Sequence, residues 1–166
     1  MDKAEFSKRV NAAMDRLYRI TCGQLREPQD RMDAIQDALF KAWTHRERLR
    51  NPEYFETWLI RILINECHNH QRRLRRVAPL EDEILEAARA PEDFQDHDGA
   101  AIREAIYALK EKYRTVILLH CVEDYSIDEV SMILKLPRET VRTRLRRAKA
   151  ALRQALDETN KEDGNR

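Results

Sequence analysis

The chain has 166 residues, and its 31 Lys and Arg nearly balance its 30 Asp and Glu. This total conceals an uneven distribution, because the net charge is +5 for residues 1–78, −7 for residues 79–101, +5 for residues 102–156 and −2 for residues 157–166. Two basic blocks joined by an acidic segment predict two small domains. No apolar run approaches the length that spans a bilayer, and the first residues do not form a signal peptide, so we expect a cytoplasmic protein.

Glycine and cysteine usage narrows the fold class further. Only three glycines and no hairpin dipeptide between alternating runs argue against a β protein, so we expect an all-α fold. Three cysteines, widely spaced and without a CxxC pair, indicate neither a disulfide scaffold nor a zinc knuckle.

The N-terminal block predicts two helices separated by a break at residues 27–30. The first spans residues 4–26, and its apolar positions recur at helical spacing: Phe6, Val10, Ala13, Leu17 and Ile20. The second spans about 31–48, and the stripe that we expect to be buried is Met32, Ile35, Ala38, Leu39 and Trp43.

A third helix is predicted from about residue 52 to residue 75, with Asn51 and Pro52 as its start. Residues 55–64 are apolar almost all round, including Trp58 and Ile62, which predicts burial. Residues 65–76 are instead amides, imidazoles and arginines, which suit base edges and phosphates. On this block alone, a nucleic-acid surface and a solvated helix end remain equally open.

Residues 78–101 have the composition of an exposed, flexible, acidic linker. Helical periodicity resumes after it and continues to His120 and Cys121, which we expect in the core. Ser126 and Glu129 then form a capping box, and Leu136-Pro137 separates the short helix that follows from a strongly basic one. Two helices, a tight turn and a basic second helix predict a DNA-binding helix-turn-helix.

The order of these motifs resembles a bacterial sigma factor of the extracytoplasmic-function (ECF) type, from about residue 4 to residue 156. The segments that carry the resemblance are DAIQDALFKAW (33–43), FETWLIRILINECHNHQRR (55–73) and YRTVILLHCVEDYSIDEVSMILKLPRETVRTRLRRAKAAL (113–152). The resemblance implies two small helical domains, region 2 in residues 1–77 and region 4 in residues 102–157, joined by the acidic flexible linker 78–101. It also implies promoter DNA and core RNA polymerase as partners, and an anti-sigma factor as regulator.

By the same resemblance, three sets of residues match functional positions of the family. The helix that docks on polymerase corresponds to Asp33, Gln36, Asp37, Phe40 and Trp43. The surface that meets the melted −10 element corresponds to Arg61, Asn65, His68, Asn69 and Arg72. The recognition helix for the −35 element corresponds to Arg142, Thr143, Arg146 and Arg147, with Arg138 and Thr140 at its leading end.

The chain departs from the family pattern at three places. Leu109-Lys110 replaces a usual Leu-Pro, Lys135 stands where glycine is usual in the turn, and Glu139 replaces another customary glycine. A left-handed lysine in the turn costs roughly 1–2 kcal/mol. Glu139 has two interpretations, as an acceptor for a cytosine amine or as a charge at the helix start. The promoter sequence is therefore not transferable from the family.

Other functions have less support in the sequence. Cys67, His68 and His70 resemble metal ligands but have no second ligand pair nearby, so we expect no metal and no cofactor. There is no nucleophile elbow, phosphate loop or HExxH motif, so we expect no enzyme. The competing hypotheses are a stand-alone helix-turn-helix regulator that binds duplex DNA and a pure protein-interaction module.

Overall fold

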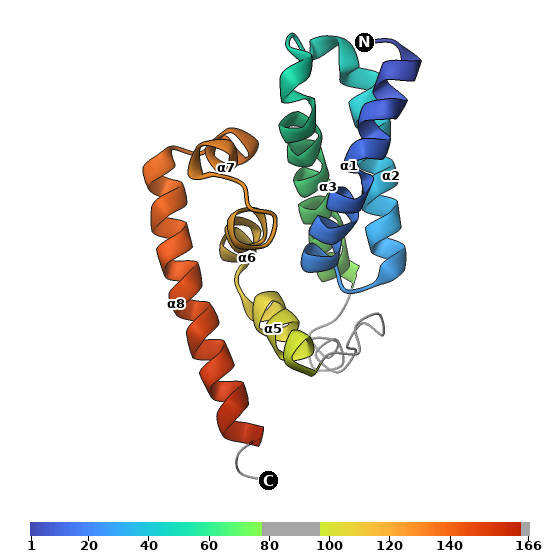
Figure 1. The fold of residues 1–166 in the computed structure, drawn as a ribbon. Coiled ribbons are helices and arrows are strands. Elements are labelled where there is room, and N and C mark those ends of the chain that lie inside the picture. Colours follow the sequence, from blue (N-terminus) through green and yellow to red (C-terminus); the bar gives the residue numbers. More distant parts are fainter. Residues whose placement is uncertain (78–96, 164–166) are drawn as a thin grey trace.

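The computed structural model describes residues 1–77 and 97–163, and within these residues every regular element is a helix (Figure 1). The predicted all-α class is confirmed for this part of the chain. Most of the predicted linker, residues 78–96, lies outside the described residues. No helix in the described residues is both long and apolar enough to cross a membrane.

The helices form two groups that lie side by side (Figure 1). The N-terminal bundle contains α1 (Lys3–Gln24), α2 (Pro28–His45), the short η1 (Arg46–Arg48) and η2 (Pro52–Tyr54), and α3 (Phe55–Val77). The C-terminal bundle contains α5 (His97–Ala108), α6 (Glu111–Ile117), η3 (Leu118–Val122), α7 (Ile127–Leu134) and α8 (Arg138–Asp163). Helix α5 thus begins earlier than residue 102, where we expected the second domain to start.

The apolar positions predicted for α1 are all buried and meet α2 and α3 in one core. The ring of Phe6 packs edge-on against Trp43, with 5.1 Å between ring centroids, and against Phe55, with 5.6 Å. Leu59 and Ile60 of α3 are fully buried beside them. Burial of this kind is the main stabilising contribution in a small helical bundle.

The predicted burial of Met32 is wrong, because its side chain is 47% exposed while neighbouring Arg31 is 2% exposed. Arg31 donates from Nε to the carbonyl of Leu25 at 2.8 Å and from Nη2 to the carbonyl of Arg26 at 2.7 Å. These carbonyls follow the end of α1 and need donors. Satisfying them draws the arginine inward and turns Met32 outward.

The third helix also differs from the prediction in its first turn. Residues 52–54 form the separate turn η2, capped by Asn51, whose side chain accepts from the backbone N–H of Glu53 at 3.0 Å. Helix α3 starts only at Phe55, and Trp58 and Ile62 are half-buried rather than enclosed. One side of α3 therefore lies outside the core of its own bundle.

In the C-terminal bundle, Val116, Leu119, Val130, Ile133 and Val141 form the core. The placement of Cys121 in that core is wrong, since the residue is exposed. The cause is η3, a π-helical turn that continues α6 and shifts the helix face by the extra residue it contains. His120 is half-buried, and its Nδ1 lies 2.7 Å from the carbonyl oxygen of Tyr125.

The two bundles contact each other through α1 and α3 on one side and α5, α6, η3 and α7 on the other. Gly23 of α1 lies directly against Leu118 of η3. A Cβ built at Gly23 would lie 2.3 Å from Cδ2 of Leu118, too close for any real contact. With the Leu118 side chain in its present conformation, the absence of a Cβ at Gly23 leaves room for this contact between the bundles.

Candidate nucleic-acid interfaces

The helix-turn-helix is formed by α7 and α8. Ser126 caps α7, and its carbonyl accepts from Val130 at 2.9 Å. Helix α7 ends at Leu134, and the following residue, Lys135, adopts the left-handed conformation (φ 53°, ψ 45°), as the comparison with the usual glycine predicts. The backbone N–H of Leu136 then donates to the carbonyl of Ser131 at 3.1 Å, and α8 begins at Arg138. Cap and turn together fix the angle at which α8 leaves α7.

Four arginines predicted to read the −35 element are exposed on α8, namely Arg138, Arg142, Arg146 and Arg147. Thr140 and Thr143 are half-buried beside them. Arg138 pairs with Asp128 of α7 at 2.8 Å, and Arg142 pairs with Glu139. Glu139 thus holds the Arg142 guanidinium near the start of α8. The N–H groups of a guanidinium suit the oxygens of phosphates and the acceptor atoms of guanine edges.

The residues predicted to meet the −10 element lie along α3, but they differ in how accessible they are. Asn65 and Arg72 are exposed, and Asn69 is half-buried, with its Oδ1 accepting from Arg72 Nη2 at 3.1 Å. Arg61 and His68 instead contact the C-terminal bundle. The residues predicted to meet the −10 element therefore all lie on α3, but Arg61 and His68 are not free to contact DNA in this arrangement.

Arg61 and His68 are both bound to the facing helices. Arg61 donates from Nε to the carbonyl of Ile133 at 3.0 Å and from Nη2 to that of Met132, at the end of α7. Partial burial lowers the pKa of Arg61. The two ring nitrogens of His68 lie 3.2 Å from Thr115 Oγ1 and 3.3 Å from a Glu111 oxygen.

A cavity of about 350 Å³ lies where α3 meets α6, α7 and α8. It is lined on the α3 side by Arg61, Asn65 and His68, and on the other side by Lys112, Lys135 and Arg144, among others. Four cationic side chains thus outnumber the one carboxylate of the lining, Glu111, so the cavity is cationic on balance, and it belongs to the junction between the bundles. Within the described residues no three His, Cys, Asp or Glu side chains lie where they could hold a metal ion.

The residues of α2 that are predicted to dock on polymerase differ in exposure: some face solvent, and Trp43 packs into the bundle. Phe40 is 73% exposed, an unusual position for so large an apolar side chain. Asp33 and Asp37 are half-buried and Gln36 is exposed. Trp43 packs into the bundle against Phe6, and Arg46 stacks over its ring at 3.9 Å. The outward face is therefore acidic and amide-rich, with Phe40 protruding from it.

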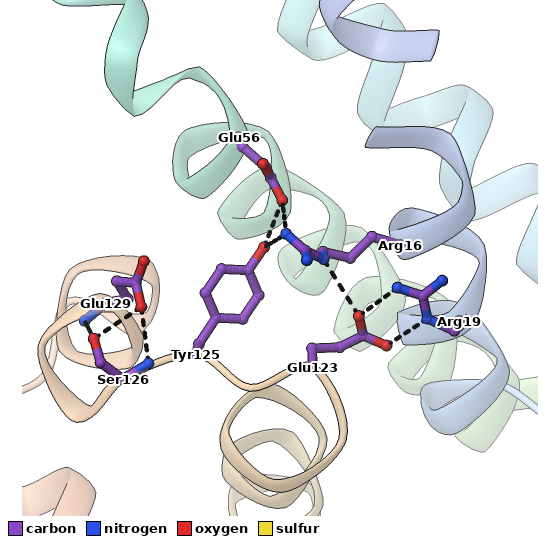
Figure 2. Close-up of polar contacts among 7 residues, drawn as sticks. All are labelled: Arg16, Arg19, Glu56, Glu123, Tyr125, Ser126 and Glu129. Atoms are coloured by element: carbon purple, nitrogen blue, oxygen red, sulfur yellow. Dashed lines mark hydrogen bonds and ion pairs between the residues drawn. The ribbon is translucent and has the colours of Figure 1, made fainter. Parts of the chain in front are cut away.

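One group of polar residues was missed by sequence reasoning. Arg16 and Arg19 of α1, Glu56 of α3, and Glu123 and Tyr125 of the C-terminal bundle form a single cluster (Figure 2). Each residue alone looks like an ordinary charged or aromatic side chain on a helix. Only the packing of segments far apart in the sequence brings them together.

A helix-turn-helix with a basic second helix, in the same chain as a helix that ends in amides and arginines, defines a helical DNA-binding protein of transcription. Comparison with known families agrees. Residues 10–77 match the model for sigma-70 region 2, and residues 99–152 match that for sigma-70 region 4.

Relatives cover nearly the whole chain. The RNA polymerase sigma factor SigV of Bacillus subtilis is 31% identical over 138 residues, 82% of this chain and 81% of that protein. The ECF RNA polymerase sigma factor SigW of the same organism is 29% identical and covers 93% of this chain and 90% of its own length. The chain belongs to the sigma-70 family of RNA polymerase sigma factors, and within it to the ECF type.

Two solved structures share the fold. The sigma factor RpoE in complex with the anti-sigma factor NepR from Bartonella quintana has a TM-score of 0.74 and 22% identity, and covers 92% of this chain and 96% of its own. CnrH in complex with the cytosolic domain of CnrY has a TM-score of 0.70 and 23% identity, with 95% and 90% covered.

Proposed function

We propose that this sigma factor binds core RNA polymerase through α2, reads the −10 element with α3 and reads the −35 element with α8, and so helps to melt promoter DNA. In this proposal region 2 is residues 1–77, the connector is residues 78–101 and region 4 is residues 102–157. The protein acts in the cytoplasm as an initiation factor without enzymatic activity.

Support for the polymerase contact comes from the exposed face of α2. An aromatic ring that is 73% exposed, as Phe40 is, matches the anchors that dominate protein interfaces. Asp37 is held from α3, with an oxygen 3.1 Å from His70 Nε2 and 3.9 Å from Arg73 Nη2. This acidic rim around an aromatic anchor suits a basic partner surface.

Support for the −10 contact comes from the exposed polar residues of α3. Opening a promoter requires a base to leave the stack, at a cost of a few kcal/mol. The Asn65 amide offers paired donors and acceptors for an unpaired base, and Arg72 offers charge for its backbone. Because α3 is anchored by Leu59 and Ile60 in the core, these groups project from a rigid element.

The −35 contact requires only duplex reading, which a helix in the major groove provides. Arg142 and Arg146 stand one helical turn apart on the exposed side of α8. The DNA-binding surfaces of α3 and α8 each bind weakly, but both are held at a fixed spacing on one polymerase. Their combined affinity for a promoter therefore exceeds the affinity of either surface alone.

One observation carries the proposal: the chain holds both a helix-turn-helix and, in the other bundle, a helix with an amide and arginine surface. A stand-alone duplex-binding regulator has no need of the second surface. Because two proteins of the same fold were solved with an anti-sigma factor or a partner's cytosolic domain, we also propose an anti-sigma factor as regulator.

The test is in vitro transcription with core bacterial RNA polymerase and this protein on a library of random promoters, followed by sequencing of the DNA upstream of each transcript. We expect protein-dependent transcripts that share two motifs at a fixed spacing. Duplex binding by the protein alone, with no transcripts, would favour the stand-alone regulator instead.

A further inference from the structure

Glu66 lies on α3 among the residues assigned to the −10 element, yet its own side chain is only 4% exposed. It meets α2, where Nζ of Lys41 donates to Oε1 of Glu66 at 2.6 Å. A carboxylate that leaves water needs compensating donors, and the ammonium group of Lys41 supplies one from the neighbouring helix. This ion pair lies inside the N-terminal bundle, at the contact of α2 with α3.

The same oxygen of Glu66 also accepts from an amide of the −10 set. Asn69, one helical turn later, donates from Nδ2 to Glu66 Oε1 at 3.3 Å. The other end of this amide, Oδ1, accepts from Arg72 Nη2 at 3.1 Å, and Arg72 Nε donates to the carbonyl of His68 at 3.3 Å. Hydrogen bonds therefore connect the buried α2–α3 contact with the exposed guanidinium of Arg72.

The chemistry of Glu66 determines which way the Asn69 amide faces. A carboxylate only accepts hydrogen bonds, whereas an amide has donors at one end and an acceptor at the other. The NH₂ group of Asn69 is therefore the end that faces Glu66. If the amide turned over, its oxygen would lie against a buried acceptor and its NH₂ group against the donors of Arg72. Both contacts would then lose their hydrogen bonds, which is costly at a half-buried site.

An amide with one orientation distinguishes bases better than an amide that can turn over. An unpaired base is recognised by hydrogen bonds to its Watson–Crick edge, along which donors and acceptors follow a different order in each base. A fixed amide matches one order, whereas a rotating amide accepts the reverse order as well. Asn69 is half-buried and Arg72 is exposed, so a strand that lies along this part of α3 can contact both.

We propose that Glu66 is a positioning residue for −10 recognition, because its buried carboxylate fixes the orientation of the Asn69 amide and so increases base selectivity at one position of the −10 element. Lys41 stabilises the carboxylate and takes no part in the choice of base. The inference rests on the proposed function for the assignment of Asn69 to the −10 element. The orientation itself rests on the hydrogen bonds within the N-terminal bundle.

The main variant is Glu66→Gln in the full chain. Glutamine has nearly the same shape, but its amide can either accept from Asn69 or donate to it, so Asn69 can adopt both orientations. Because the side chain of Lys41 is 47% exposed, water solvates its charge once the pair is lost, and the variant is expected to fold. The matched control is Lys41→Gln, which breaks the same ion pair from α2 but leaves the carboxylate beside Asn69.

The first measurement is transcription from the random promoter library at pH 8, with core bacterial RNA polymerase and each variant. We expect Glu66→Gln to lower the preference for the favoured base at one −10 position by about threefold or more, the scale of one hydrogen bond, and to leave the −35 motif unchanged. Lys41→Gln is expected to keep the wild-type preference, although its melting temperature falls. Asn69→Ala should abolish that preference, and Glu66→Gln should have no further effect in the Asn69→Ala background, because Glu66 acts through Asn69.

The second measurement is NMR of the protein without polymerase, which reports the orientation of the amide directly. The Asn69 side-chain NH₂ signal is identified by its absence from the Asn69→Ala spectrum. In wild type and Lys41→Gln, we expect its Overhauser contacts to the side-chain protons of Glu66 and none to those of Arg72. In Glu66→Gln, we expect contacts to both neighbours, since the amide then adopts both orientations.

An unchanged −10 motif in Glu66→Gln overturns the proposal. An equal loss of preference in Lys41→Gln also overturns it, because the ion pair between α2 and α3 would then be what matters. Failure of the proposed function looks different. In that case the wild type itself gives no shared −10 motif, while the Overhauser contacts still report whether Glu66 orients the Asn69 amide.

Discussion

Ser126 and Glu129 cap helix α7 reciprocally. The Ser126 side chain accepts from the Glu129 backbone N–H at 3.2 Å, and the Glu129 carboxylate accepts from the Ser126 N–H at 2.8 Å (Figure 2). Helix α7 has only eight residues, so its first turn is a large share of its hydrogen bonding. The cap also sets the start of the helix-turn-helix.

Ser126→Ala is therefore expected to lower the free energy of unfolding by about 1 kcal/mol. The measurement is urea denaturation followed by circular dichroism. Ser7→Ala, at an exposed position of α1, is the control and is expected to change stability little. Equal effects of the two substitutions would show that the capping box contributes nothing specific.

Lys135→Gly is expected to stabilise the protein by about 0.5–1.5 kcal/mol. Lys135 holds a φ of 53°, which costs an L-residue roughly 1–2 kcal/mol, whereas glycine adopts it freely but has more freedom to lose on folding. Thermal unfolding is the measurement, and Lys135→Ala is the matched control. Alanine keeps the strained Cβ, so a rise in melting temperature with alanine would contradict the explanation.

The local features of this protein follow from neighbouring residues, and these were predictable. The capping box at Ser126, the left-handed turn at Lys135 and the buried face of α1 each depend on a few positions close in sequence. The boundaries of the helices were less predictable. The structure divides the predicted third helix at Phe55, where η2 ends and α3 begins.

What sequence reasoning missed depends on tertiary contacts. Arg31 is buried because carbonyls after α1 need its donors, and Cys121 is exposed because a π-helical turn shifts the helix face. Likewise, the spacing of Glu123 carries no sign that Arg19, far away in sequence, lies against it. The assigned roles of the −10, −35 and polymerase-binding residues remain predictions, although the structure shows where each side chain lies.

The three cysteines are expected to react with a disulfide reagent at very different rates. Cys121 is exposed and Cys22 half-buried, whereas Cys67 is fully buried in α3, where burial raises the pKa of its thiol to about 12. Because the thiolate is the reactive form, Cys67 lacks both access and charge near neutral pH. Ellman's reagent at pH 8 should show Cys67 only after unfolding in urea. Cys121→Ser should remove the fastest phase, and a fast phase lost in Cys67→Ser would contradict the burial.

Acidification is expected to weaken the folded protein through His68. Burial lowers the pKa of this imidazole, and nearby Arg72 and Arg114 act in the same direction, while Glu111 opposes them. The unfolded chain, with an ordinary pKa of about 6.5, then binds the proton more readily than the folded chain. The stabilising contribution is therefore complete above about pH 6.5 and is lost as pH falls through the lower folded pKa.

The measurement is the free energy of unfolding of wild type and His68→Gln across that pH range. Glutamine keeps a polar side chain but cannot titrate, so the difference between the two proteins should shrink as pH falls below about 6.5. Parallel curves for the two proteins would show that His68 does not contribute to the pH dependence.

Arg142→Ala and Arg146→Ala are each expected to weaken binding to −35 duplex DNA by about 1–3 kcal/mol, if each guanidinium forms a two-pronged contact to a base. Both side chains are exposed on α8, so neither substitution should alter stability by more than about 0.5 kcal/mol. Arg153→Ala, exposed further along the same helix, is the matched control for lost charge. Fluorescence anisotropy on the selected −35 duplex and on a scrambled one separates the two effects. Loss of a base contact lowers the affinity for the selected duplex alone, whereas loss of a phosphate contact lowers the affinity for both duplexes about equally. Unchanged binding by both variants would refute the assignment of this face of α8 to the −35 element.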